Sequence, residues 1–212
     1  MVVWLSCQED FAVVGDKVAN EGAVVVYPTD TVYGLGASPY LDNAVKKCFE
    51  IKSREEGKPM PVLFRGVEDA QRIVVMDEKA RLLASTYWPG KLTLVLPVAK
   101  TSRISRQLLN VSGYLAARVP NHRCALRLIK ACGGALIGTS ANVSGRPSIT
   151  DPEDPELFRI ARKADFFIKG RSGDLGSKAS TVISFSEDRT KEITVLREGA
   201  IPSKEIFALL GD

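Results

Sequence analysis

Long hydrophobic runs are missing from this sequence. The longest apolar stretches, residues 22–26 and 92–98, are far shorter than the roughly 20 residues that a helix needs to cross a bilayer. The segment from Met1 to Glu9 has no basic start, no long apolar stretch and no small-residue cleavage site, so nothing in it indicates secretion. We therefore expect a cytoplasmic protein without membrane spans.

Histidine and cysteine are scarce. The chain has one histidine, His122, and its cysteines fall in no paired short spacing, which argues against a zinc cluster. We expect these cysteines to be reduced, buried thiols: Cys7, Cys48, Cys124 and Cys132. A Ser-His-Asp hydrolase would have to use His122, and the segment around Ser140 lacks the G-x-S-x-G pattern, so a hydrolase is disfavoured.

Aromatic residues and excess charge are also low. Aromatics make up 7% of the 212 residues, and the formal net charge is only +4 with a pI near 8.9. This mild basic bias suits an anionic ligand, but it does not decide between a nucleotide and RNA. The contents of 45% hydrophobic and 25% charged residues are typical of a globular chain with a substantial core. One domain over residues 1–212 is the simplest expectation.

Alternating apolar patterns predict an α/β fold. Helical spacing covers residues 11–18, 41–51, 67–73, 78–87, 122–132, 155–163 and 204–210. Strand-like runs cover residues 24–27, 61–64, 92–98, 115–119, 135–138, 166–169, 181–185 and 193–197. We therefore expect a mixed sheet covered by helices. Residues 170–178 combine glycines with polar residues and show no period, which predicts a mobile surface loop that could affect substrate entry.

Two polar segments follow apolar elements in the first third of the chain. In residues 27–36, hydroxyls, Asp30 and two glycines follow a buried strand; they could bind a small polar ligand or simply cap a turn. Further on, Lys52, Arg54 and Lys58 place three cations close together around a glycine. This cluster could clamp a polyphosphate, or it could be favourable charge at the end of a helix.

Further candidates lie at the ends of later strands. In residues 135–145 a buried strand opens into Ser140 and Asn142, which can hydrogen-bond phosphate or carboxylate oxygens. Arg118 ends another buried strand and would be satisfied by a ligand carboxylate or by a structural ion pair. Arg197 ends the last strand in the same way.

Taken together, these motifs resemble those of the YrdC-like threonylcarbamoyl-AMP synthase family. The resemblance spans nearly the whole chain. It is carried by Pro28-Thr29-Asp30-Thr31-Val32-Tyr33-Gly34-Leu35-Gly36, Lys52-x-Arg54, Pro89-Gly90, Arg118-x-Pro120, Ser140-Ala141-Asn142-x-Ser144-Gly145 and Ser180-Thr181-Val182. It implies the YrdC-like fold, a twisted open mixed sheet flanked by helices with a positively charged concave face.

The resemblance also implies a reaction and a set of site residues. L-threonine, bicarbonate and ATP would be condensed to threonylcarbamoyl-AMP and pyrophosphate, with Mg²⁺ held mainly by the ATP phosphates and not by the protein. The implied catalytic group is Lys52, Arg54, Ser140 and Asn142. The implied L-threonine pocket is Thr31, Leu63, Arg118, Ser140 and Ser180. The implied ATP site is Arg54, Lys58, Tyr114, Asn142, Thr150 and Arg197.

The implied partners are a downstream transferase complex that passes the threonylcarbamoyl group to tRNA, and tRNA or double-stranded RNA itself. The sequence departs from the family pattern at Glu55, Lys91, Ser184 and Leu63, and its end at Asp212 suggests a short member without a further C-terminal domain.

Two alternatives stay open beside the synthase. One is an RNA-binding or ribosome-assembly module without chemistry; its expected signature, exposed aromatics beside cations, is weak because Trp4 and Trp88 lie in core-like patterns. The other is a carbamoyl-adenylate half-reaction that starts from carbamoyl phosphate, although enzymes of that kind usually carry additional domains.

Overall fold

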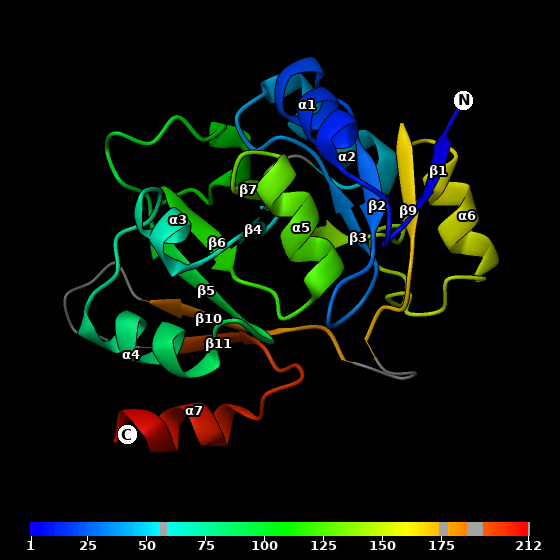
Figure 1. The fold of residues 1–212 in the computed structure, drawn as a ribbon. Helices are drawn as coiled ribbons and strands as arrows, with labels where there is room; N and C mark the ends of the chain where they lie inside the picture. Colours follow the sequence, from blue (N-terminus) through cyan, green and yellow to red (C-terminus); the bar gives the residue numbers. More distant parts are fainter. Residues whose placement is uncertain (56–58, 174–177, 186–192, 212) are drawn as a thin grey trace.

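The computed structural model describes residues 1–55, 59–173, 178–185 and 193–211 as a mixed α/β structure (Figure 1). Its helices are α1 (Ala12–Glu21), α2 (Asp42–Lys52), α3 (Val67–Gln71), α4 (Glu78–Tyr87), α5 (Arg123–Ala131), α6 (Pro155–Ala161) and α7 (Ser203–Leu210), with a 3₁₀ turn, η1 (Arg106–Leu108). The fold class predicted from the sequence is confirmed, and each predicted helix is present. The positive charge of a concave face stays a prediction.

The first sheet has five strands in the order β1-β9-β2-β3-β8. Its strands are β1 (Val3–Ser6), β2 (Val25–Tyr27), β3 (Gly34–Gly36), β8 (Thr139–Ser140) and β9 (Phe166–Lys169). β9 pairs in parallel with β1 and β2, whereas β3 pairs antiparallel with β2 and β8. The ends of β2 and β3 therefore bring residues 28–33 next to β8.

The second sheet has six strands in the order β11-β10-β5-β6-β4-β7. Its strands are β4 (Val62–Phe64), β5 (Leu92–Pro97), β6 (Tyr114–Arg118), β7 (Ala135–Ile137), β10 (Thr181–Phe185) and β11 (Ile193–Arg197). The pairing mixes parallel and antiparallel neighbours. The sequence predicted one mixed sheet, and the structure instead divides the strands between two. The predicted strands are all present, but β1, β3 and β8 were not predicted.

Two of the three missed strands, β3 and β8, are too short or too atypical to give a periodic pattern. β3 has the sequence Gly-Leu-Gly, and β8 has only two residues. Glycine lowers β-propensity, so such strands form because neighbouring strands supply the hydrogen bonds. At Gly36 an added Cβ would lie 2.7 Å from the Tyr27 ring and 2.9 Å from the Ile137 carbonyl oxygen, so the strand needs a residue without a side chain there.

β2 separates two hydrophobic cores. Val26 points into the larger core with helices α2, α4 and α6, while Val25 and Tyr27 point into a smaller core with α1 and α5. This alternation is expected for a strand that is buried on both faces. The Tyr27 hydroxyl also donates to the carbonyl oxygen of Ile137 at 3.0 Å. That hydrogen bond joins the first sheet to β7 of the second.

The sequence predictions for the side chains of Cys7, Cys124 and Trp4 were wrong. Cys7 and Cys124 are joined in a disulfide with Cα atoms 5.4 Å apart, whereas only Cys48 and Cys132 are free and buried. Trp4 is not a core residue: it is 48% exposed and lies against Phe158 and Phe167 at one edge of the sheet. Spacing along the chain could not reveal either feature, because both depend on which elements become neighbours.

The described part of the predicted loop at residues 170–178 is docked on the protein. Ser172 is 2% exposed, and its hydroxyl donates to the Thr29 carbonyl oxygen at 3.1 Å. Residues 174–177 lie outside the described residues. Within the part of the chain that the structure describes, no helix combines the length and the apolar character that a bilayer crossing requires.

Candidate functional site

A cavity of about 340 Å³ lies where the two sheets meet. The first sheet contributes Gly34, Thr139 and Ser140, and the second contributes side chains from β4, β5, β6, β10 and β11. The lining residues that carry charge or hydrogen-bonding groups are Thr29, Thr31, Tyr33, Arg54, Thr93, Asn110, Tyr114, Arg118, Thr139, Ser140, Ser180 and Arg197. The cavity is therefore rich in cations and hydroxyls, with apolar walls between them.

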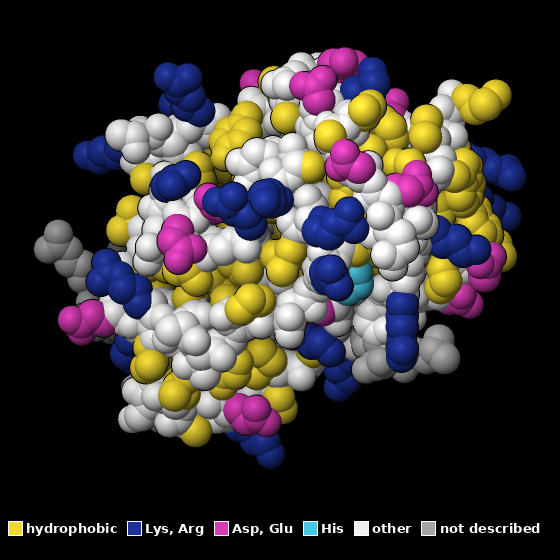
Figure 2. All heavy atoms as spheres, in the orientation of Figure 1, with side chains coloured by type: hydrophobic (Ala, Val, Ile, Leu, Met, Phe, Trp, Pro, Cys, Tyr) yellow, Lys and Arg dark blue, Asp and Glu magenta, His cyan; other side chains and the backbone are white. Residues whose placement is uncertain are grey.

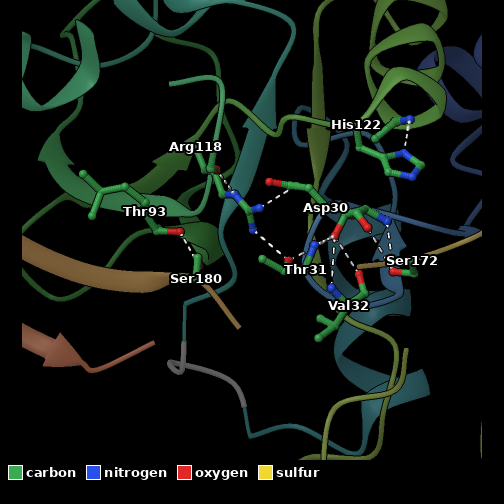
Figure 3. A network of polar contacts seen from close by, with 12 residues as sticks. Asp30, Thr31, Val32, Thr93, Arg118, His122, Ser172 and Ser180 are labelled. Carbon is green, nitrogen blue, oxygen red and sulfur yellow. Dashed lines mark hydrogen bonds and ion pairs between the residues drawn. The ribbon is translucent and has the colours of Figure 1, made fainter. Parts of the chain in front are cut away.

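Arg118 is a buried cation at the end of β6. It is 5% exposed, and its Nη2 donates to Asp30 Oδ1 at 2.6 Å (Figure 3). Its Nη1 donates to Thr31 Oγ1 at 3.0 Å and its Nε to the Gly90 carbonyl oxygen at 2.7 Å. A guanidinium has five N–H donors, so these contacts leave donor capacity for a ligand in the cavity.

Asp30 supplies the counter-charge for Arg118. Its side chain is 9% exposed, and its Oδ2 is buried without a hydrogen-bond partner among the described residues. Burial lowers the pKa of Arg118, and the charge and hydrogen bond of Asp30 oppose that shift. The pair thus holds a charged guanidinium inside the protein, where a carboxylate ligand would bind strongly.

Thr29 shapes the turn that presents Thr31 to Arg118. The Thr29 hydroxyl accepts from the amides of Thr31 and Val32 at 3.1 and 3.3 Å and donates to the Val32 carbonyl oxygen at 2.7 Å. Such local side-chain to backbone bonds are the common way in which threonine stabilises a tight turn. The turn places the Thr31 hydroxyl 3.1 Å from that of Thr29 and within reach of the guanidinium.

Ser180 is held from two sides on the same wall as Arg118, next to the start of β10. Its hydroxyl lies 2.8 Å from that of Thr93 (Figure 3), and Arg197 Nη2 donates to the same hydroxyl at 3.1 Å. Arg197 also donates to the Ser180 carbonyl oxygen from Nε and Nη2. Burial lowers the pKa of Arg197, and the charges of Arg118 and Arg54 lower it further. The three guanidiniums therefore repel one another, and an anionic ligand would relieve that repulsion.

Lys52 lies beneath the cavity and is not part of its lining. It is 1% exposed, and its ammonium donates to the carbonyl oxygens of Ser140 and Asn142, the latter at 2.8 Å, and to Asn142 Oδ1 at 3.4 Å. Burial lowers the pKa of Lys52 to about 8, and the charge of Arg54 adds to that shift. In the structure Lys52 fastens residues 140–142 to the end of α2.

The structure brings most of the predicted site residues together. Eight of them line the cavity: Thr31, Arg54, Leu63, Tyr114, Arg118, Ser140, Ser180 and Arg197. Lys52, Asn142 and Thr150 do not line it, and Asn142 uses its side-chain amide to donate to the carbonyl oxygens of Val143 and Arg146. Lys58 lies outside the described residues.

Several polar residues at the site were not among the predicted site residues: Thr29, Asp30, Tyr33, Thr93, Asn110 and Thr139. Asp30 was predicted only as one polar group of a segment that could bind a ligand or cap a turn, and its pairing with Arg118 was not predicted because the two residues are 88 positions apart. Thr93 lies in the otherwise apolar run Leu92–Pro97 and is 2% exposed. A single hydroxyl in a buried strand needs a partner, so this pattern could have indicated the contact with Ser180.

Cationic side chains are not confined to one patch of the surface. Figure 2 shows Lys and Arg side chains spread over the face that carries α5, with Asp and Glu side chains among them. The concentration of positive charge that distinguishes the cavity is therefore local to Arg54, Arg118 and Arg197.

Comparison with known proteins gives the site a family context. The chain is 36% identical over 198 residues to a threonylcarbamoyl-AMP synthase of Pyrococcus abyssi, covering 91% of this chain and 55% of the relative. The structure of P. abyssi Sua5 complexed with L-threonine matches with a TM-score of 0.84 at 32% identity, over 100% of this chain and 61% of that one. Escherichia coli YciO matches with a TM-score of 0.80 at 26% identity, over 97% and 100% of the two chains.

These matches extend over most of the chain. The chain spans about half the length of the P. abyssi relative, whereas it matches the whole of YciO. The Sua5/YciO/YrdC family model, described as telomere recombination, matches residues 17–199, which include every residue of the cavity lining. The chain therefore belongs to the Sua5/YciO/YrdC family.

Proposed function

We propose that this chain is a threonylcarbamoyl-AMP synthase, which condenses L-threonine, bicarbonate and ATP and releases pyrophosphate. The observation that carries the proposal is the convergence of Arg54, Arg118 and Arg197 with threonine and serine hydroxyls in one cavity. Both proposed organic substrates are anionic at the groups that would be held there. The names of the P. abyssi relative and of the Sua5 complex with L-threonine support the same substrate class.

The amino acid would bind at the Arg118 end of the cavity. The L-threonine carboxylate would accept from the Arg118 guanidinium, whose position Asp30 and Thr31 fix. The hydroxyls of Ser140 and Ser180 would bind the remaining polar groups of the substrate. Leu63 supplies an apolar wall on the same lining, and a methyl group could pack against it.

ATP would occupy the part of the cavity that contains Arg54 and Arg197. The two guanidiniums would bind phosphate oxygens and the Tyr114 side chain would contact the nucleotide. Lys58, Asn142 and Thr150 complete the proposed ATP site, although the last two do not line the cavity in this structure. Mg²⁺ would enter as part of the substrate Mg-ATP and would be held mainly by the ATP phosphates.

The chemical step would need positioning and charge stabilisation but no covalent enzyme intermediate. The threonine amine and bicarbonate would form a carbamate with loss of one water molecule, and a carbamate oxygen would then attack the α-phosphorus of ATP. The new O–P bond would form as the bond to pyrophosphate breaks, and Arg54 would stabilise the charge on the phosphates. Lys52 would act by holding residues 140–142 in place. The adenylate would then pass to a transferase complex that modifies tRNA to N6-threonylcarbamoyladenosine.

Pyrophosphate release tests the proposal directly. Purified protein would be given Mg-ATP and bicarbonate with L-threonine, with L-serine or with no amino acid. We expect release that depends on L-threonine, and we expect Arg54→Ala to lower kcat/KM about 100-fold, the loss typical when one charged contact to a reacting phosphate is removed. Arg159→Ala, an exposed arginine on α6, is the matched control and should leave the rate unchanged.

Two results would contradict the synthase. Folded protein that releases no pyrophosphate under any of these conditions, but binds RNA with a steep salt dependence, would favour the RNA-binding module. Release that requires carbamoyl phosphate in place of bicarbonate and L-threonine would favour the carbamoyl-adenylate half-reaction.

A further inference from the structure

The Cys7–Cys124 disulfide joins a surface turn to the start of a helix. Cys7 directly follows β1 and is partly exposed. Cys124 is the second residue of α5 and is 6% exposed. The two cysteines are 117 positions apart in the sequence. Cys7 is therefore the more exposed of the two bonded residues.

Two positively charged features lie near Cys124. The amides at the N-terminus of α5 carry partial positive charge, and Arg127 lies one turn further along the same helix. Arg127 also contacts the other side of the bond, because its guanidinium donates to the carbonyl oxygens of Cys7 and Glu9 at 2.6 and 2.7 Å. If a reagent attacked Cys7, the departing sulfur of Cys124 would be a good leaving group.

The two free cysteines are buried thiols. Burial raises the pKa of both Cys48 and Cys132 to about 12, so their thiols stay protonated. Cys132 follows the last residue of α5, the helix that begins at Cys124. The helix α5 thus has a disulfide-bonded cysteine near its start and a free, buried cysteine just after its end, and the second serves as a control for the first.

The disulfide lies against a segment that reaches the candidate site. We call residues 170–173 the strap. A Cβ added at Gly170 would lie 2.5 Å from Cys7 Sγ and 3.1 Å from Pro28 Cγ, so the strap runs between the disulfide and the turn that carries Thr31. The Gly173 amide donates to the Thr29 carbonyl oxygen at 2.9 Å, and the Thr29 amide donates to Ser172 Oγ at 3.2 Å.

His122 gives the strap a second attachment next to the disulfide. Its Nε2 lies 2.9 Å from the carbonyl oxygen of Arg171, and its Nδ1 accepts from the Ala125 amide at 3.3 Å (Figure 3 labels His122 and Ser172). The histidine therefore connects the strap to the same helix terminus that carries Cys124. The strap therefore contacts both the disulfide region and the turn around Thr29, so a change at the disulfide can alter that turn through the strap.

We propose that Cys7 and Cys124 are a reversible redox site whose closed, disulfide form holds the strap against the turn of Thr29. A thiolate of a small dithiol would attack Cys7 Sγ, and the electron pair of the broken S–S bond would go to Cys124 Sγ. The second thiol of the reagent would then displace Cys7 from the mixed disulfide. Two electrons and two protons pass to the protein, which ends with two thiols, while the dithiol leaves as its cyclic disulfide.

The first test titrates the intact protein in buffers that contain reduced and oxidised dithiothreitol in graded ratios. Free thiols would be alkylated and each cysteine-containing peptide quantified by mass spectrometry. We expect Cys7 and Cys124 to become alkylated together and reversibly, and Cys48 and Cys132 to react only after denaturation. Alkylation of Cys7 in protein never exposed to reductant, or resistance of the bond until the protein unfolds, would overturn the proposal.

The second test follows hydrogen exchange of the Gly173 and Thr29 amides in oxidised and reduced protein. We expect reduction to speed exchange at both amides at least 10-fold, together with a fall in Tm of about 10 °C for opening a loop of this length. Cys124→Ser should reproduce both changes under oxidising conditions, whereas Cys132→Ser should not speed exchange at these amides. Unchanged exchange at both amides after full reduction would refute the link to the strap, whatever the Tm. Neither test depends on the proposed synthase activity.

Discussion

Lys52 and Arg118 are both buried cations, but the protein satisfies them in different ways. Arg118 pairs with the carboxylate of Asp30 and keeps donors for a ligand, and it lines the cavity. Lys52 has only the oxygens of Ser140 and Asn142 as hydrogen-bond acceptors among the described residues, and it lies behind the cavity wall. The buried cation that has a counter-charge is positioned to bind a ligand. The one that is surrounded by carbonyl oxygens instead stabilises the backbone that provides them.

The largest expected effect comes from breaking the Arg118 pair. Arg118→Ala should lower the free energy of unfolding by about 3–5 kcal/mol, because it leaves the Asp30 carboxylate buried without its partner. Chemical denaturation would measure this loss. The double variant with Asp30→Asn should recover a large part of it, since no uncompensated charge remains. If the double variant is as unstable as the single one, the two residues are not coupled in the way the contact suggests.

The comparison predicts a smaller, pH-dependent effect at Lys52. Its pKa falls from 10.5 to about 8 on folding, so between these pH values the unfolded chain binds more protons than the folded protein. The stability of the wild type relative to Lys52→Met should therefore rise as pH increases from about 8 to 10.5, by at most about 3 kcal/mol. Other titrating groups cancel in the difference. A stability difference that stays flat across this range would show that Lys52 is not desolvated in solution.

The smallest expected effect is at Thr93, on the strand next to that of Arg118. Thr93→Val removes the hydroxyl that contacts Ser180 but keeps the shape of the side chain. We expect a loss of about 1 kcal/mol in the free energy of unfolding, since Arg197 still donates to the Ser180 hydroxyl. Thermal denaturation of this variant beside the wild type would measure it. Equal stability of the variant and the wild type would mean that the contact contributes nothing.

The sequence predicted the regular elements better than the relations between them. α4 was predicted with the bounds that the structure gives it, because apolar spacing and an Asp77 cap act locally. Asp30 was not recognised, because nothing in its neighbours along the chain indicates a partner at Arg118. The Cys7–Cys124 bond was missed for the same reason. Local chemistry determines helices and turns, whereas ion pairs and cross-links depend on the assembled fold.

The candidate site shows the same division. Motifs identified Thr31, Ser140 and Ser180 as polar groups at strand ends, and the structure brings them into one cavity. The motif Lys52-x-Arg54 looked like one cationic cluster, but the helix α2 ends at Lys52 and turns that side chain inward, while Arg54 reaches the lining. The residue types correctly predicted two cations, but only the structure shows that Lys52 is buried behind the lining while Arg54 is part of it.

The position of the cavity between the two sheets has a consequence for stability. A ligand held there would contact β3 and β8 on one side and β5, β6 and β10 on the other. The bound ligand would stabilise the contact between the two sheets, because the sheets could not separate without releasing it. Binding to the folded state alone adds about 2.7 kcal/mol at a ligand concentration of 100 Kd. The free energy needed to separate the two sheets therefore rises as more of the cavity is occupied by ligand.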